Sequence, residues 1–142
     1  MTAIHQEYEV LGNNFVSAGS ASDEVKKTLK MLGIDPMIIR RIAIAMYEGE
    51  INMVIHAGGG RAIVDIDPDK IKVVLKDQGP GIADIELAMK DGYSTAPDNI
   101  RSMGFGAGMG LPNMKKYTDR FRIESEVGVG TEVTLEVDFN DK

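Results

Sequence analysis

The sequence predicts an α+β fold, a two-layer sandwich in which helices cover one face of a mostly antiparallel mixed sheet. Three observations favour this fold. Strand-like and helix-like segments are mixed along the chain, the last four predicted strands come as hairpins, and one long helical pattern is apolar over much of its circumference. The 142 residues suffice for one compact domain and are too few for two ordinary ones, so we expect a single domain over residues 1–142.

The N-terminal part is expected to contain one strand and one helix. Residues 6–11 alternate loosely between polar and apolar side chains, which predicts a strand. The helix ends near Gly33, because Val25 and Leu29 lie at helical spacing before that glycine. Its start falls somewhere within residues 14–22.

A second helix is marked at both of its ends. Asp35 is a good N-cap and Pro36 suits the first helical position, while the glycines at 58–60 stop the helix. Because apolar side chains occupy much of its circumference, this helix is expected at the centre of the domain.

Four further strands are predicted as two hairpins. Residues 61–66 and 71–76 are joined by a turn at 67–70, and residues 120–126 and 131–139 flank a glycine-containing turn. Strands joined by such short turns pair antiparallel.

The segment between the two hairpins carries weaker signals. Residues 84–90 favour a short helix, and residues 91–110 favour a long mobile loop. A last helix is expected from about Leu111 to Tyr117.

Composition excludes several classes of function. No cysteine is present, so neither a disulfide nor a thiolate metal site can form. The net charge of −6 and the dispersed Lys and Arg disfavour direct binding to nucleic acid. The sequence has neither an apolar run of membrane-spanning length nor a signal-peptide pattern at its N-terminus, so we expect a cytoplasmic protein without membrane attachment.

Three polar residues interrupt the central helix at intervals of four: Glu48, Asn52 and His56. Each step of four turns the helix about 40° beyond a full revolution, so all three project from one side. The ordinary explanation is a solvent-facing stripe. The alternative is a nucleotide site, in which the amide oxygen of Asn52 ligates Mg²⁺ and the carboxylate of Glu48 orients or deprotonates an attacking hydroxyl.

A short polar stretch, DQGPG, follows the strand at 71–76 directly. Asp, Gly and Pro all favour turns, so an ordinary turn is the simplest interpretation. In the functional interpretation, Gly79 and Gly81 let a flat ligand approach the backbone, and Asp77 accepts a hydrogen bond from it. An adenine amino group fits that role.

The stretch GFGAGMG at 104–110 has four glycines in seven residues and precedes a predicted helix. Its exposed backbone N–H groups and the helix N-terminus would suit a phosphate chain. The stretch is neither a P-loop nor a dinucleotide fingerprint. Arg101, just upstream, could reach a terminal phosphate, although a solvated loop arginine is the simpler interpretation.

The order of these features resembles the GHKL ATPase superfamily, which includes gyrase B, Hsp90, histidine kinases and MutL and whose nucleotide site is the Bergerat fold. A Glu-xxx-Asn helix, a strand followed by Asp-x-Gly-x-Gly, a loop ending Gly-x-Gly-x-Gly and a Gly-Thr hairpin occur in order over residues 48–131. Within the superfamily, the chain is most similar to the anti-sigma-factor and stressosome switch serine kinases of the RsbW, SpoIIAB and RsbT type. Residues 77–95 and the stretch GAGMGLPNMKKYTDRF look most like the RsbT branch.

The resemblance implies a site for ATP and Mg²⁺. Glu48 would be the catalytic base or its orienter, Asn52 would ligate the Mg²⁺ that bridges the phosphates, and His56 would support them. Asp77 would bind the adenine amino group, and Thr131 would support that contact. Close approach to the nucleotide and wrapping of its phosphates would fall to Gly79, Gly81, Arg101, Gly104, Phe105, Gly106, Ala107, Gly108, Met109, Gly110 and Leu111.

Two departures from the superfamily pattern affect these assignments. Gly49 stands where the superfamily usually has a small apolar residue, often Ala. Glycine inside a helix weakens it by about 1 kcal/mol relative to Ala, unless it permits close packing. Glu50 adds a second acid beside Glu48, so either could be the base.

The resemblance implies a serine/threonine kinase that phosphorylates a STAS-domain, anti-anti-sigma-like partner in a bacterial regulatory switch. The alternative is a nucleotide-gated binding switch, an anti-sigma factor or a phosphatase activator, without essential kinase activity. A degenerate domain that binds no nucleotide is disfavoured, because Glu48, Asn52, Asp77 and the glycines are all present. A homodimer is also compatible with the resemblance.

Overall fold

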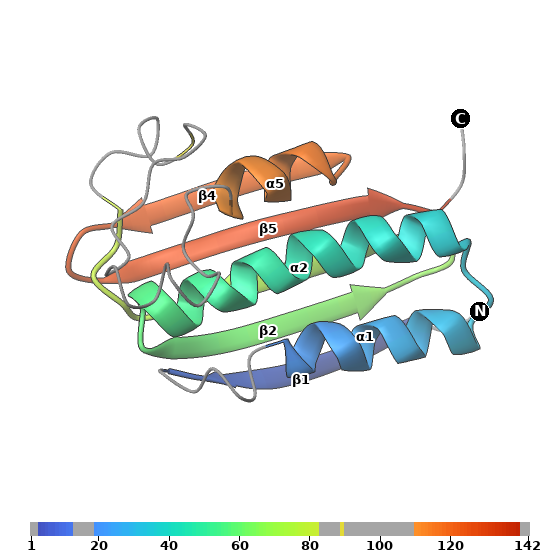
Figure 1. Cartoon of the computed structure of the whole chain (residues 1–142), viewed down its shortest axis with the longest axis horizontal. Helices are drawn as coiled ribbons and strands as arrows, with labels where there is room; N and C mark the ends of the chain where they lie inside the picture. Colours follow the sequence, from blue (N-terminus) through green and yellow to red (C-terminus); the bar gives the residue numbers. More distant parts are fainter. Residues whose placement is uncertain (1–2, 13–18, 83–88, 90–109, 140–142) are drawn as a thin grey trace, which may run out of the picture.

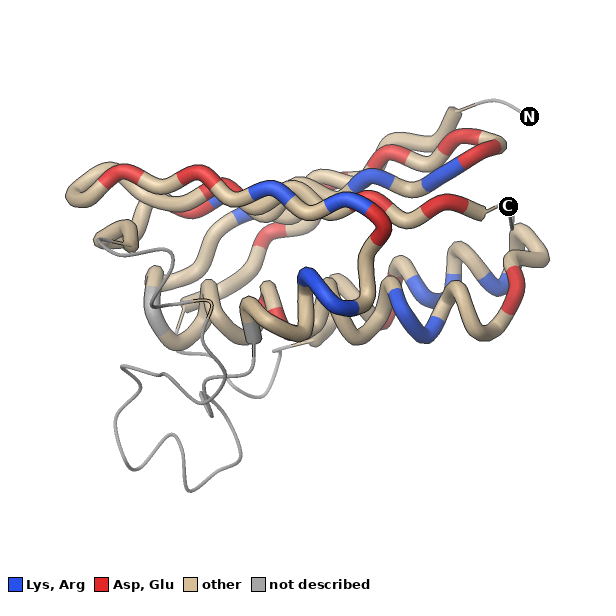
Figure 2. Tube along the Cα trace, turned by 90° about the horizontal axis from the view of Figure 1, so that it is seen from above, with Lys and Arg blue, Asp and Glu red and all other residues tan. Residues whose placement is uncertain are grey.

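The computed structural model describes residues 3–12, 19–82, 89 and 110–139. In this part of the chain, a five-stranded sheet and the helices α1, α2 and α5 form two layers (Figure 1). Figure 2 shows that the helices lie together on one face of the sheet and leave its other face open. The elements are β1 (Ile4–Leu11), α1 (Ser20–Met31), α2 (Pro36–His56), β2 (Gly59–Ile66), β3 (Lys70–Lys76), α5 (Gly110–Lys116), β4 (Arg120–Glu126) and β5 (Gly130–Asp138).

The strand order is β1-β2-β3-β5-β4, and each neighbouring pair runs antiparallel. Both predicted hairpins are present, as β2–β3 and β4–β5. The second hairpin places β5 rather than β4 beside β3, so β5 becomes an interior strand. The predicted α+β sandwich is confirmed, with a sheet that is antiparallel throughout the described strands.

Alternation along the strands separates a buried face from an open one. Side chains that point toward the helices are small or branched apolar residues, as expected for a half-buried antiparallel sheet. The buried positions of the three interior strands are Ala62, Val64, Ile66, Ile71, Val73, Leu75, Val133, Leu135 and Val137.

The central helix α2 begins and ends as its sequence predicts. The Asp35 side chain caps it by accepting a hydrogen bond from the N–H of Met37 at 2.8 Å, and Pro36 takes the first helical position. The helix ends at His56, just before the glycines at 58–60. It packs against α1, α5 and the sheet, which explains why apolar side chains surround so much of it. None of the described helices is long and apolar enough to cross a membrane.

Helix α1 begins at Ser20 because a carboxylate from α2 satisfies its first N–H groups. Gly19 occupies the N-cap position and has no side chain to cap with. The buried Glu50 carboxylate instead accepts hydrogen bonds from the backbone N–H groups of Gly19, Ala21 and Ser22, at 3.2, 3.2 and 2.6 Å. The sequence could not fix this start, since the cap comes from another helix.

The open face of the sheet carries charges that alternate in sign. One row across all five strands runs His5, Asp65, Lys72, Glu136 and Arg120 by strand register. His5 Nδ1 lies 2.6 Å from an Asp65 carboxylate oxygen at one end, and Arg120 pairs with Glu136 at the other. The face is therefore solvated and largely neutralised by its own ion pairs.

The other predicted boundaries differ only slightly. The first strand begins two residues before the predicted 6–11, at Ile4, and α5 begins at Gly110 rather than Leu111. The short helix at 84–90 and the loop at 91–110 lie outside the described residues, apart from Met89 and Gly110.

Candidate functional site

Glu48 and Asn52 lie one turn apart on α2, and both are partly buried. The Glu48 side chain is near enough to the Asn113 side chain on α5 for that residue to lower its pKa, so it faces that helix. Burial raises the pKa of Glu48, and the hydrogen bond from Asn113 partly offsets this. A carboxylate in such a setting can accept a proton more readily than a fully solvated one.

The two neighbouring acids of α2 have different environments. Glu50 is fully occupied with backbone N–H groups of α1 and is only 2% exposed, whereas Glu48 is partly accessible on the side of α5. Because Glu50 cannot reach a ligand without uncapping α1, Glu48 is the better candidate base.

Gly49 lets α2 pack closely against both β3 and α5. A Cβ atom at this position would lie 2.0 Å from Leu75 Cδ1 and 3.3 Å from Met114 Sδ. The first distance is well inside van der Waals contact, so a side chain here would displace Leu75. Close packing therefore explains this glycine.

Asp77 follows β3 and is fixed by two backbone donors. Its Oδ1 accepts from the N–H of Gly79 at 2.9 Å and from the N–H of Thr131 at 3.1 Å. The Asp77 N–H in turn donates to the Thr131 carbonyl at 3.0 Å. All these side-chain bonds end on Oδ1, which leaves Oδ2 as the oxygen for a ligand donor.

The hydroxyl of Thr131 contacts Ser125, its register partner on β4. Ser125 Oγ accepts from the N–H of Ile82 at 2.7 Å, and its own proton can go to the Gly130 carbonyl at 3.2 Å or to Thr131 Oγ1 at 2.8 Å. In either arrangement Thr131 Oγ1 keeps a lone pair, so it can accept from a ligand donor, as Asp77 Oδ2 can.

Gly79 and Gly81 have packing reasons of their own. A Cβ at Gly79 would lie 2.6 Å from Ala57 Cα, at the end of α2. Gly81 has a positive φ of 79°, and its Cβ would lie 2.4 Å from the Glu126 carbonyl oxygen. Because these two glycines have no side chain, the turn after β3 lies close to both the end of α2 and the β4–β5 hairpin, at one end of the molecule.

The remaining predicted site residues stand as follows. Gly110 is the first residue of α5, and the Leu111 side chain is buried in the core, so only the Leu111 backbone is suited to ligand contact. His56 is the last residue of α2, and the prediction for its side chain falls outside what is described. Arg101, Gly104, Phe105, Gly106, Ala107, Gly108 and Met109 also lie outside the described residues.

Sequence reasoning missed three residues that shape this site. Asn113 and Ser125 each contact a predicted site residue from an element far along the chain, and Glu50 was not recognised as a cap. Only Ser125 had a local signal, because it faces Thr131 across a short hairpin.

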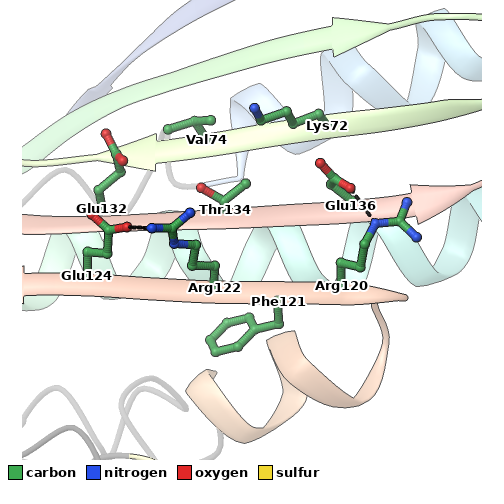
Figure 3. A pocket seen from close by; sticks show the side chains of 9 residues that line it. All are labelled: Lys72, Val74, Arg120, Phe121, Arg122, Glu124, Glu132, Thr134 and Glu136. Carbon is green, nitrogen blue, oxygen red and sulfur yellow. Dashed lines mark hydrogen bonds and ion pairs between the residues drawn. The ribbon is translucent and has the colours of Figure 1, made fainter.

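A shallow pocket on the open face is separate from this site (Figure 3). Its charged residues are largely engaged with one another: Arg122 pairs with Glu124, and Arg120 pairs with Glu136. It is formed by β3, β4 and β5 alone.

Comparison with known proteins identifies the family. Residues 37–141 match the family of histidine kinase-, DNA gyrase B- and HSP90-like ATPases. The chain belongs to this ATPase family. The resemblance to the GHKL superfamily is thereby confirmed, and membership of an ATPase family implies the use of ATP.

Two curated relatives of this ATPase domain match most of its length. It is 35% identical over 112 residues to the serine/threonine-protein kinase RsbT of Bacillus subtilis, with 76% of this chain and 78% of that protein covered. It is 34% identical over 115 residues to the anti-sigma F factor of Clostridium beijerinckii, with 75% and 77% covered.

Among solved structures, the RsbU and RsbW domains of a Mycobacterium tuberculosis protein superpose on the domain with a TM-score of 0.58. The sequence identity is 17%, and the match covers 96% of this chain but only 32% of the other. At this identity the likeness shows the fold, and this chain spans about a third of that longer one.

Proposed function

We propose that the domain is an ATP-dependent protein serine/threonine kinase that phosphorylates a STAS-domain, anti-anti-sigma-like partner in a bacterial regulatory switch. The observation that carries this proposal is that the two neighbouring acids of α2 have different surroundings. Glu50 caps α1, whereas Glu48 lies one turn before Asn52 and is available at the site. The likeness to a named serine/threonine-protein kinase over most of both chains supports it. We take the chain as a single kinase domain that acts in the cytoplasm.

The adenine end of the site would lie at Asp77 and Thr131. Asp77 Oδ2 and Thr131 Oγ1 are both acceptors, and an adenine amino group offers two N–H donors to such a pair, directly or through water. Gly79 and Gly81 keep the backbone of this turn close to α2 and the β4–β5 hairpin.

The phosphate end would lie along α2 toward α5. From Ala57 back to Glu48 is nine residues, or about 13 Å of helix, so the two ends define an elongated site. The amide oxygen of Asn52 is a hard oxygen ligand of the type that Mg²⁺ accepts, and this ion needs few protein ligands. Bound there, Mg²⁺ would neutralise phosphate charge.

The other assignments complete the proposed site from the sequence. His56 would support the metal end, Arg101 would reach a terminal phosphate, and the stretch 104–111 would offer its backbone N–H groups to the phosphates. In this proposal the protein contributes to catalysis by positioning ATP and the partner's hydroxyl and by neutralising phosphate charge. The serine or threonine hydroxyl of the partner would lose its proton to the Glu48 carboxylate as it attacks the terminal phosphate, and the bond from that phosphorus to the β-phosphate oxygen would break, so that ADP leaves.

The test is phosphate transfer from labelled ATP to candidate STAS-domain proteins. Wild type is expected to label a partner on serine or threonine, and Glu48→Gln is expected to label it at least about 100-fold more slowly. ATP affinity should change by less than about tenfold, since the base contributes little to ground-state binding. No transfer from wild type to any candidate partner would refute the kinase proposal, and equal transfer by wild type and Glu48→Gln would refute the role of Glu48 as the base.

A second candidate is a nucleotide-gated binding switch, favoured by the likeness to anti-sigma F factors. The domain would then sequester a sigma factor, or activate a phosphatase, and the bound nucleotide would set its affinity. Capture of a sigma factor that differs at least about fivefold between ATP and ADP, and that survives Glu48→Gln, would favour this candidate. A homodimer is tested in the same samples by their mass in solution.

A further inference from the structure

We propose that Ser125 is a positioning residue for the adenine end of the proposed site: its hydroxyl holds both the turn after β3 and the Thr131 side chain where they can meet the base. This inference rests on the proposed function and deepens it, because it names a residue that would help to select adenine. It is drawn from the hydrogen bonds of the Ser125 hydroxyl and from the place of Ser125 in the sheet.

Ser125 lies where the helix-facing side of the β4–β5 hairpin changes from apolar to polar. On this side the register pairs are Phe121 with Leu135, Ile123 with Val133 and, at the end of the hairpin, Ser125 with Thr131. Ser125 and Thr131 are both partly buried. Partly buried hydroxyl groups cost stability unless they find hydrogen-bond partners, so the change to two hydroxyls calls for a reason other than packing.

The Ser125 hydroxyl joins the turn after β3 to Thr131. Ser125 Oγ accepts from the backbone N–H of Ile82 at 2.7 Å and lies 2.8 Å from Thr131 Oγ1 and 3.2 Å from the Gly130 carbonyl oxygen. Its proton serves one of the last two contacts, and the proton of Thr131 can serve the contact between the hydroxyls when that of Ser125 does not. In either arrangement the contact with Ser125 fixes the position of Thr131 Oγ1.

The turn at 77–82 is held against the hairpin at both of its ends. At its start, the Asp77 N–H donates to the Thr131 carbonyl at 3.0 Å, and Asp77 Oδ1 accepts from the Thr131 N–H at 3.1 Å. At its other end, the Ile82 N–H donates to Ser125 Oγ. Two side chains, the Asp77 carboxylate and the Ser125 hydroxyl, therefore fasten this turn, and Ser125 alone of the two also holds the Thr131 hydroxyl.

Loss of the Ser125 hydroxyl would release the far end of the turn and the Thr131 side chain together. In the proposed site, Asp77 Oδ2 and Thr131 Oγ1 accept from the adenine amino group. Hydrogen bonds weaken steeply with poor distance and angle, so a small displacement of these two acceptors would weaken the hold on that amino group. Ser125 need not touch the base, because it acts through Asp77 and Thr131.

The experiment compares Ser125→Ala and Ser125→Thr with wild type, and Thr134→Ala is the matched control. Thr134 lies on the open face of the same hairpin, so the control also removes one hydroxyl, but away from the proposed site (Figure 3). The first measurement is hydrogen exchange of the Ile82 amide by NMR on nucleotide-free protein. Ser125→Ala should speed this exchange at least about fivefold, the effect expected for losing one hydrogen bond. Ser125→Thr, which keeps the hydroxyl and suits a strand, and Thr134→Ala should both stay close to wild type.

The second measurement is the affinity for ATP and for purine riboside triphosphate, which is ATP without the amino group, by isothermal calorimetry. Wild type should bind ATP at least about tenfold more tightly than the analogue. Ser125→Ala should reduce this preference at least about threefold, mainly through weaker ATP binding, while Ser125→Thr and Thr134→Ala keep it. The ratio of the two affinities cancels any general loss of stability, because both nucleotides bind the same folded protein.

Equal weakening of both nucleotides by Ser125→Ala would overturn the inference, since the loss would then not concern the amino group. Unchanged exchange at Ile82 would also overturn it, even if the melting temperature fell. Phosphate transfer tests the kinase proposal separately. If wild type labels no partner but prefers ATP as described, and Ser125→Ala reduces that preference, the kinase proposal fails and the role of Ser125 stands.

Discussion

Glu50 shows how a single buried carboxylate can replace a local helix cap. It accepts from two backbone N–H groups of α1 and from that of Gly19, the N-cap residue, which has no side chain to cap the helix itself. Such bonds are charge-assisted, and the helix dipole favours a negative group at this end. The residue therefore ties α1 to α2, and we expect its acidity to serve the structure rather than catalysis.

Removal of that carboxylate should be strongly destabilising. Glu50→Ala leaves three N–H groups near α1 without their acceptor and opens a cavity, which should lower the free energy of unfolding by about 3 kcal/mol or more. Urea unfolding followed by circular dichroism measures the change. A loss below about 1 kcal/mol would contradict the proposed role of Glu50 as the cap.

Glu50 should also make stability depend on pH. Burial raises its pKa, against the opposing effect of hydrogen bonds from Ser22, Ala21 and Gly19. A carboxyl group whose pKa is higher in the folded than in the unfolded state stabilises the fold fully below its unfolded pKa. That contribution is lost as the pH rises through the folded pKa.

The stability of wild type relative to Glu50→Gln should therefore be greater near pH 4 than near pH 7. Urea titrations of both proteins at each pH give the difference, and the comparison cancels the other titrating groups. A difference that grows with rising pH would show that the three N–H donors outweigh burial.

Asp77 is the residue on which nucleotide binding should depend most. Asp77→Asn keeps the shape of the side chain but removes its negative charge. The N–H groups of Gly79 and Thr131 and an adenine amino group would all donate to that charge, so ATP affinity should fall at least about tenfold. Isothermal calorimetry measures it, with Glu124→Gln on the open face as the matched control. Equal affinities for wild type and Asp77→Asn would place the adenine elsewhere.

At the level of elements, the crossing of α2 over β3 and beside α5 depends on Gly49. Gly49→Ala should gain about 1 kcal/mol in helix propensity but lose about 1–3 kcal/mol by overpacking against Leu75, for a net loss of stability. Leu75→Ala alone should cost about 2–5 kcal/mol through the cavity it opens.

The two changes should be coupled when combined. In the Leu75→Ala background the space beside position 49 is vacant, so Gly49→Ala should stabilise rather than destabilise. A double-mutant cycle by urea unfolding measures this reversal of sign. Additive effects would mean that Leu75 does not limit the space at Gly49.

At the scale of the whole molecule, saturating ATP and Mg²⁺ should stabilise the fold. At a ligand concentration about 100-fold above Kd, binding adds about 2.7 kcal/mol, which raises the melting temperature by about 5–10 °C for a domain of this size. Differential scanning fluorimetry measures the shift, and a chelator should reduce it. The shift should be clearly smaller in Asp77→Asn, and an identical shift in that variant would contradict the proposed site.

The architecture was predictable because its signals are local. Asp35 and Pro36 mark one end of α2, the glycines at 58–60 mark the other, and the turn at 67–70 sets the first hairpin. The polar residues Glu48, Asn52 and Asp77 were also visible as interruptions of regular patterns.

What the sequence left open depends on contacts between distant segments. Nothing near Ser20 reveals that α1 is capped by Glu50, and nothing near Glu48 reveals Asn113. Those pairings exist only once α2 has α1 on one side and α5 on the other. For the same reason, choosing between Glu48 and Glu50 required the packing of the helices.

The Asp77 carboxylate has a consequence for the nucleobase that the proposed site would accept. Its Oδ1 accepts from the N–H groups of Gly79 and Thr131, and a carboxylate offers only lone pairs to a base. Guanine carries a carbonyl oxygen where adenine carries its amino group, and that oxygen would meet an acceptor with no proton between them. We therefore expect the proposed site to discriminate against GTP, because unsatisfied polar atoms cost more than a difference in shape.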